Sequence, residues 1–259
     1  MGLDGDMYEF TDRIMQRSGR DNQKPTQELR GLYRAFAEAV AGEGSRPAQA
    51  VQAFEALVLL DKETRSEDDP GRLWNLRSLG NAYRSNGQTK EAVALLKKVV
   101  KALEGRGEED VELTKAQHDL GLAFSQDGQH KEAIAVLEKV VGIQQRTLPA
   151  GHRDRLASQH VLAVAYLKDG QIKEATARLE EIQKIQARTL GEDHPETAST
   201  QAWLADAYKL AGRLPDAIEL CERVVRTRRL FLDEKHPDLL TSHTISPEHI
   251  TKLRGLPKL

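Results

Sequence analysis

A block of about twenty residues recurs four times in this 259-residue chain at a nearly constant interval. The copies read RSLGNAYRSNGQTKEAVALL, HDLGLAFSQDGQHKEAIAVL, HVLAVAYLKDGQIKEATARL and AWLADAYKLAGRLPDAIELC. Their central glycines, Gly87, Gly128, Gly170 and Gly212, fall 41, 42 and 42 residues apart. A unit of this length cannot bury its own apolar face and has to stack on its neighbours. The repeat therefore predicts a solenoid of stacked units.

Apolar residues follow helical spacing on both sides of each central glycine. In the first copy they are Leu76, Leu79, Ala82 and Tyr83 before the glycine, and Ala92, Val93, Leu96, Val99 and Val100 after it. A glycine can adopt the left-handed conformation that ends a helix. Each unit is thus predicted to be an all-α hairpin of a helix A, a short turn and a helix B.

Small side chains recur at one position of each predicted helix. Helix A carries Gly80, Gly121, Ala163 and Ala205, and helix B carries Ala92, Ala133, Ala175 and Ala217. We expect these two positions to face each other, so that the helix axes approach to the short end of ~8–10 Å. A large residue there should overpack the joint.

The composition excludes several classes of protein. Lys+Arg 38 and Asp+Glu 40 give a net charge of -2, which provides no overall attraction for nucleic acid or an anionic membrane. No apolar run approaches the ~20 residues of a membrane span. The N-terminus lacks a secretory signal, and the single cysteine, Cys221, suits a reducing compartment. We expect a cytoplasmic protein without a cofactor or a metal.

The repeat pattern, down to LGNAY at residues 79–83, resembles the tetratricopeptide repeat (TPR). The 42-residue period, with GEDHPETAST at 191–200 and DEKHPDLLTS at 233–242, is similar to the kinesin light chain subtype. The resemblance covers roughly residues 30–242. It implies a right-handed superhelical solenoid of stacked helix-turn-helix repeats, whose A helices line a concave groove for extended peptides or partner helices.

Three segments are predicted along the chain. Residues 1–26 form an N-terminal extension with a short helix, 27–242 form the solenoid, and 243–259 form a C-terminal cap or flexible tail. The solenoid has about five units, of which the first is degenerate. Its helix A is indicated by Leu32, Phe36 and Val40, and its helix B by Ala50, Phe54, Leu57 and Val58.

In the fold that the chain resembles, residues thirteen, ten, six and three before each turn glycine should face the groove. These are Trp74, Arg77, Asn81 and Arg84; Lys115, His118, Leu122 and Ser125; Ala157, His160, Val164 and Leu167; and Ser199, Ala202, Asp206 and Lys209. Arg77 and Arg84 could together clamp a carboxylate. Trp74 beside them offers a flat apolar contact.

Several residues argue against a kinesin light chain cargo preference, a metal site or a reactive thiol in this chain. Kinesin light chains favour asparagine ten residues before the turn glycine, where this chain has other residues, so their cargo preference is not expected. His118 and His160 would lie ~10 Å apart, too far for a shared metal ion. The linker histidines His152, His194 and His236 indicate helix entries, and Cys221 indicates a core position. The arginines of 223–229 are expected to be solvated or to contact an acidic partner.

Two functions are compatible with these observations. The first is a non-catalytic adaptor that binds a protein or peptide, with acidic residues as candidate contacts, and that does not bind nucleic acid or a membrane. It could also form a homodimer through the C-terminal unit. The second is a small-molecule enzyme that uses the groove as its active site, with His118, His160 and Asp206 as the only credible acid–base set.

Overall fold

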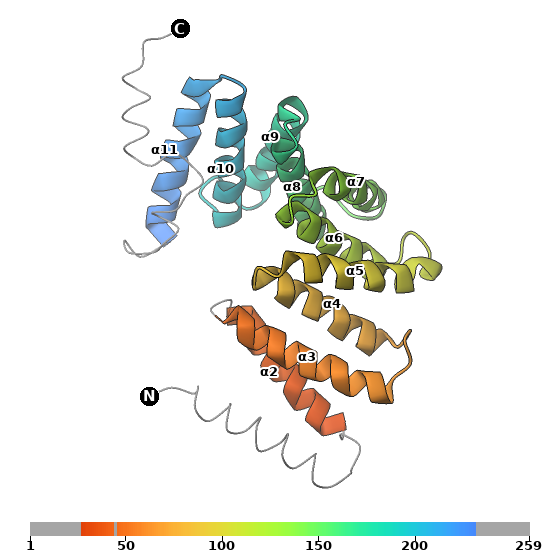
Figure 1. Ribbon diagram of the computed structural model, residues 1–259. Coiled ribbons are helices and arrows are strands. Elements are labelled where there is room, and N and C mark those ends of the chain that lie inside the picture. Colours follow the sequence, from red (N-terminus) through yellow and green to blue (C-terminus); the bar gives the residue numbers. More distant parts are fainter. Residues whose placement is uncertain (1–26, 44–45, 232–259) are drawn as a thin grey trace, which may run out of the picture. The chain divides into compact units, whose positions relative to one another are not determined.

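The computed structural model describes residues 27–43 and 46–231, and within these the regular structure is entirely helical (Figure 1). The α-helices are α2 (Gln27–Glu43), α3 (Pro47–Thr64), α4 (Pro70–Ser85), α5 (Thr89–Leu103), α6 (Val111–Gln126), α7 (His130–Thr147), α8 (Arg153–Lys168), α9 (Ile172–Thr189), α10 (Pro195–Leu210) and α11 (Leu214–Phe231). A short 3-10 helix, η1, spans Glu104–Arg106. The predicted N-terminal extension, 1–26, and the predicted C-terminal cap, 243–259, lie outside the described residues.

The helices form the predicted helix-turn-helix units. The chain divides into two compact units, Met1–Leu103 and Glu104–Leu259. Within the first, α2, α3, α4 and α5 pack in chain order, and within the second, α6 to α11 do the same. Helices α4, α6, α8 and α10 are the predicted A helices, and α5, α7, α9 and α11 are the B helices. The hairpin of α2 and α3 is the predicted degenerate unit.

Each A helix begins at a side chain that accepts a hydrogen bond from its first turn. The Asp69 carboxylate accepts from the amide of Arg72 at 2.9 Å, and Nδ1 of His194 accepts from the amide of Glu196 at 3.2 Å. Asp110 and His152 cap α6 and α8 in the same way. The interpretation of His152 and His194 as helix-entry residues is therefore confirmed, while His236 lies outside the described part of the chain.

The turn glycines end the A helices. Gly87 has a φ of +79°, in the left-handed region that favours glycine. The following amide, of Gln88, donates to the carbonyl of Tyr83 at 2.9 Å, which closes the helix end with a Schellman-type hydrogen bond. The amides that follow Gly128, Gly170 and Gly212 do the same to Phe124, Tyr166 and Tyr208. One local rule therefore sets the length of all four A helices.

The small residues of the A helices are buried, but their nearest neighbours differ from the prediction. A Cβ added to Gly80 would lie 2.7 Å from Cγ of Leu96, and one added to Gly121 would lie 2.6 Å from Cγ of Leu137. The small position of helix A thus accommodates a leucine of helix B, one turn beyond the alanine expected to face it. In the last unit Ala205 packs against Cys221, so a larger residue on one helix meets a smaller one on the other.

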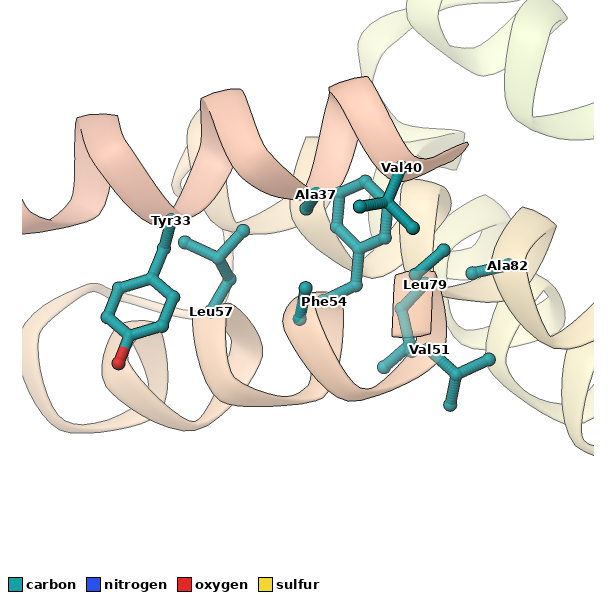
Figure 2. Packing of buried hydrophobic residues seen from close by; sticks show 10 residues of the cluster. Tyr33, Ala37, Val40, Val51, Phe54, Leu57, Leu79 and Ala82 are labelled. Carbon is teal, nitrogen blue, oxygen red and sulfur yellow. The ribbon is translucent and has the colours of Figure 1, made fainter. Parts of the chain in front are cut away.

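The helices of the degenerate unit, α2 and α3, form an apolar core together with α4. Tyr33, Ala37 and Val40 of α2 meet Phe54 and Leu57 of α3 (Figure 2). Val40, Ala50, Phe54 and Leu57 are buried as predicted, while Phe36 and Val58 are only partly buried. The α2 face that packs inward is therefore centred on Tyr33 and Ala37 and not on Phe36. The side chain of Leu32 lies outside the described part.

A tyrosine on an A helix is joined to a glutamate on the preceding B helix at three described junctions. The Tyr83 hydroxyl donates to Glu55 at 2.7 Å, and the Tyr208 hydroxyl donates to Glu180 at 2.7 Å. Tyr166 makes the same bond to Glu138. Burial, and then the hydrogen-bonded glutamate, raise the pKa of Tyr83 and Tyr208 to about 12, so that both phenols remain donors at neutral pH.

Two glycine-to-alanine substitutions should change stability in opposite directions. Gly121→Ala places a methyl group against Leu137, and overpacking of about 1–3 kcal/mol should exceed the helix-propensity gain of about 1 kcal/mol. Gly142→Ala, in α7 with nothing within 4 Å of the added carbon, should stabilise by about 0.5–1 kcal/mol. Urea unfolding of both variants measures this difference. Stabilisation by Gly121→Ala would contradict the packing described above.

The single thiol should be unreactive in the folded protein. Cys221 is 1 % exposed, and burial, with the nearby charge of Asp206, raises its pKa to about 11. Labelling with a chromogenic disulfide reagent at pH 7.5 should therefore be slow in buffer and immediate in denaturant. Rapid stoichiometric labelling under native conditions would show that this position is accessible and not part of the core.

Candidate binding site

A hollow of about 500 Å³ lies in the first compact unit, between α2, α3 and α4. Its lining residues are Glu38, Val40, Ala41, Pro47, Ala50, Phe54, Trp74, Ser78, Asn81, Ala82, Arg84 and Ser85. Three of the four groove residues expected from the first full repeat, Trp74, Asn81 and Arg84, line this hollow together. The fourth, Arg77, lies on the same helix but does not line it.

Trp74 lines this hollow, and its ring contacts aromatic and cationic neighbours. The ring of Phe54 lies 6.3 Å away at an interplanar angle of 60°, an arrangement favoured by aromatic pairs. The guanidinium carbon of Arg34, on α2, lies 4.3 Å from the centroid of the Trp74 ring. This is within the range of a cation–π interaction. The hollow therefore combines an aromatic surface with one cationic lining residue, Arg84 of α4, and one anionic lining residue, Glu38 of α2, while Arg34 of α2 lies against its tryptophan.

A polar cluster that was not predicted from the sequence is connected to Trp74 through Arg34. Asp61, at the end of α3, is fully buried, and its carboxylate accepts a hydrogen bond from Nδ2 of Asn75 at 2.6 Å. Nε of Arg65 lies 3.2 Å from the carboxylate, and Nε of Arg30 lies 3.7 Å from it. Nη2 of Arg34 donates to Oδ1 of Asn75 at 3.1 Å. A buried aspartate is thereby linked through one amide to the arginine on Trp74.

A signal for this cluster was present in the sequence. Asp61 follows Phe54 and Leu57 at the helical spacing of the apolar face of α3. A carboxylate on an apolar face has to be paired when it is buried. Arg65 follows four residues later in the sequence, but Arg30 and Asn75 could not have been named as partners, because they come from α2 and α4 and because the turn of the degenerate unit does not align with the others.

The predicted groove histidines lie in the second compact unit and contact the next A helix. Nδ1 of His118, on α6, lies 2.9 Å from Oγ of Ser158 on α8. Nδ1 of His160, on α8, lies 3.2 Å from Oγ1 of Thr200 on α10. These bonds join successive A helices at the same position as the bond from Arg34 to Asn75. One nitrogen of each ring is therefore used within the fold.

The other predicted groove residues of the second unit vary in exposure. Val164 and Leu167 are buried, at 8 % and 7 %, while Leu122 and Asp206 are half-buried. Lys209 is exposed, and Nζ of Lys115 lies 2.9 Å from the Glu112 carboxylate. Ser125 and Ala202 are buried, and Ala157 and Ser199 are exposed. None of these residues lines the hollow of the first unit or a second hollow, which lies in the second unit.

A second hollow, of about 560 Å³, lies between η1, α6 and α7 of the second unit. It is lined by Glu104, Glu108, Leu113, Gln117, Glu138, Lys139, Gly142, Ile143 and Arg146. Its charged residues are of both signs, and no residue singled out in the sequence lies in it. Of the two hollows, only the first contains residues predicted to bind a partner.

Neither a metal-binding cluster nor the predicted catalytic set is brought together in the described ranges 27–43 and 46–231. No cluster of three or more histidine, cysteine, aspartate or glutamate residues there could hold a metal ion. His118, His160 and Asp206, the candidate catalytic set, come from three different helices and share no described hollow. Within the same ranges, every helix is too short or too polar to cross a bilayer.

Acid should destabilise the protein through His160. Burial lowers the pKa of this histidine from 6.5 to about 4. Between these two pH values His160 is protonated in the unfolded chain and neutral in the folded chain. The resulting loss of stability begins as the pH falls through 6.5 and is complete near pH 4. Between pH 7.5 and 5 the wild type should lose about 1–2 kcal/mol more than His160→Gln in urea unfolding. An equal loss in both proteins would contradict this role.

Comparison with known proteins identifies the fold family. A family model described as the tetratricopeptide repeat matches residues 37–105, 112–186 and 154–229. No curated protein matches the chain. Among solved structures, the kinesin-light-chain-like, nearly identical TPR-like repeats of Podosopora anserina are 36% identical to it. They superpose with a TM-score of 0.64 over 79% of this chain and 95% of theirs.

Two more distant structures share the fold alone. BtubC (BKLC) from P. vanneervenii is 18% identical, with a TM-score of 0.66 over 87% of this chain and 89% of its own. MamA from Desulfovibrio magneticus RS-1 is 19% identical, with a TM-score of 0.55 over 79% and 97%. With its all-α stack of helix-turn-helix units and the match of the family model over most of its length, the chain belongs to the tetratricopeptide repeat family and is similar to kinesin light chain-type repeats.

Proposed function

We propose that this protein is a non-catalytic interaction module that binds a peptide segment of another protein in the hollow between α2, α3 and α4. The observation that carries this proposal is that Trp74, Asn81 and Arg84 line one hollow of about 500 Å³. A hollow of this size suits a few side chains of an extended segment. Tetratricopeptide repeats commonly bind protein or peptide partners, in agreement with this proposal.

The chemistry of the lining favours a peptide with both apolar and charged side chains. Trp74, Phe54 and Val40 offer apolar surface, which contributes affinity through burial. Arg84 offers a planar donor group that pairs well with a carboxylate, and Asn81 offers an amide for the peptide backbone. The partner segment is therefore one in which an acidic residue lies close to an apolar residue.

The enzyme alternative lacks a comparable observation. One nitrogen of His118 and one of His160 are within hydrogen-bond distance of Ser158 and Thr200, so these rings help to join A helices. A general acid–base pair has to reach the same substrate atom, or nearly so. The two described hollows contain neither histidine, and Asp206 lies on a further helix. Peptide binding therefore remains the favoured function.

Substitutions in the hollow should weaken binding of peptides selected from a random peptide library panned against the full chain. Arg84→Glu should reduce the affinity by about 10–100-fold, because it replaces a charge-assisted hydrogen bond with a repulsion. Ser78→Leu should weaken binding by occupying part of the hollow. Fluorescence polarisation of the labelled peptides measures both effects.

The matched control is Lys98→Glu, which makes the same charge change at an exposed position of α5 in the same unit. It should bind the peptides as the wild type does. Circular dichroism checks that all variants remain helical. If Arg84→Glu and Ser78→Leu bind the selected peptides as tightly as Lys98→Glu does, the hollow is not the binding site and the proposed function is wrong.

A further inference from the structure

We propose that Arg34 recognises a carboxylate of the bound segment, and that the buried Asp61 positions Arg34 for this task through Asn75. This inference rests on the proposed function, since it concerns the same hollow. It adds a specificity-determining residue from α2, a helix of the degenerate unit. It gives the acidic side chain of that segment a second partner besides Arg84.

Arg34 does not itself line the hollow, but its guanidinium lies against Trp74, which does. Its guanidinium carbon lies 4.3 Å from the centroid of the Trp74 ring, and Trp74 lines the hollow. Glu38, one helical turn further along α2, lines it as well. An apolar ligand side chain that contacts Trp74 would therefore bring its neighbouring residue close to Arg34. Arg34 itself is only partly exposed, so water screens its charge less than that of a fully exposed side chain.

Asn75 holds Arg34 in this position because its amide can point in only one direction. Nδ2 of Asn75 donates to Oδ2 of Asp61 at 2.6 Å, which requires the acceptor Oδ1 to lie on the other side. That oxygen accepts from Nη2 of Arg34 at 3.1 Å. Asn75 is 3 % exposed and Asp61 is fully buried, so neither side chain has room to turn away. The carboxylate of Asp61 thereby sets the direction of the Arg34 hydrogen bond from two side chains away.

The same arrangement leaves the positive charge of Arg34 available. Asp61 has its own cations, with Nε of Arg65 at 3.2 Å and Nε of Arg30 at 3.7 Å. Arg34 meets a neutral amide and an aromatic ring instead, and no carboxylate of the described residues lies within ion-pair distance of it. A fold that used Arg34 only to neutralise Asp61 would bring the two into direct contact. The amide between them orients the guanidinium without cancelling its charge.

A guanidinium held in this way is suited to a carboxylate. Arginine has five N–H donors in one plane, and only one of those of Arg34 is used by Asn75. Stacking on Trp74 restricts the plane of the group, so less entropy is lost when a ligand binds. Carboxylates accept two parallel hydrogen bonds from such a group, and neutral amides do not match this geometry as well. We therefore expect a preference for glutamate or aspartate over glutamine or asparagine in the bound segment.

The test compares two peptides that differ only in charge. A library-selected peptide containing glutamate and its glutamine counterpart are titrated into the full chain carrying Trp203→Phe, in which Trp74 is the remaining tryptophan and serves as the fluorescent reporter. The parent should bind the glutamate peptide about 10–100-fold more tightly. Arg34→Gln should lower this ratio about tenfold, to the part that Arg84 provides, while binding of the glutamine peptide is retained. Arg34→Lys, which keeps the charge but not the planar fork, should recover part of the preference.

The positioning role is tested with Asn75→Ala, which leaves Asp61 with both of its arginines. It should lower the acid-to-amide ratio by several-fold while the glutamine peptide binds as before. A purely structural role of Asn75 would reduce thermal stability and weaken both peptides equally. Asp61→Asn is a larger perturbation of the core and should also lower the ratio if the variant folds. If it does not fold, Asn75→Ala alone tests the positioning role.

The possible failures are distinguishable. If neither peptide changes the Trp74 fluorescence and the library yields no peptide that depends on Arg84, the proposed function fails. If peptides bind in the hollow but the glutamate preference is absent, or is undiminished in Arg34→Gln, the inference about Arg34 is overturned and the proposed function stands. If the preference depends on Arg34 but is unchanged in Asn75→Ala, the positioning role of Asp61 through Asn75 is overturned.

Discussion

The close approach of two helices within each repeat is the constraint on which the other features of this structure depend. Leu96 and Leu137 fill the space beside Gly80 and Gly121. A Cβ added to either glycine would lie less than 3 Å from a leucine atom and would clash with it. This contact fixes how helix A crosses helix B in these repeats. The hydrogen bonds between the repeats, such as that of Tyr208 with Glu180, can recur with the same geometry only because the hairpins are alike. Small residues thus matter here for the side chains that they admit.

Much of the fold could be predicted because local chemistry repeats at a fixed period. The turn glycines, with Gly87 at a φ of +79°, mark the helix ends, and the caps, such as Asp69, mark the starts. Even the degenerate unit was recognisable from Phe54 and Leu57. The partners of Gly80 and Gly121 could not be predicted: the pattern suggested alanine, and the nearest atoms belong to Leu96 and Leu137. A sequence shows which residues share one face of a helix. It does not show the angle at which two helices cross, and this angle decides which side chains of the two faces meet.

The candidate site was predictable in part, for a related reason. Trp74, Asn81 and Arg84 share one face of α4, so helical spacing alone brings them to one hollow. Arg77 shares that face as well, yet it does not line the hollow, because the lining also depends on where α2 lies. Arg34 and Asp61 were missed since their roles arise only when α2, α3 and α4 are packed together. The histidines illustrate the converse case, where a side chain expected to meet a ligand is used between helices.

The matched pairs of small and large residues also have an evolutionary consequence. Gly80 and Leu96 belong to one repeat, as do Gly121 and Leu137, and as do Ala205 and Cys221. Each of these three periods thus carries both halves of its own complementary joint. Gene duplication or deletion that moves one whole period leaves every such joint intact, whereas recombination between the two helices of a period would mix halves of different size. Whole-period changes are therefore the route by which a lineage could lengthen or shorten this protein without first repairing its interior.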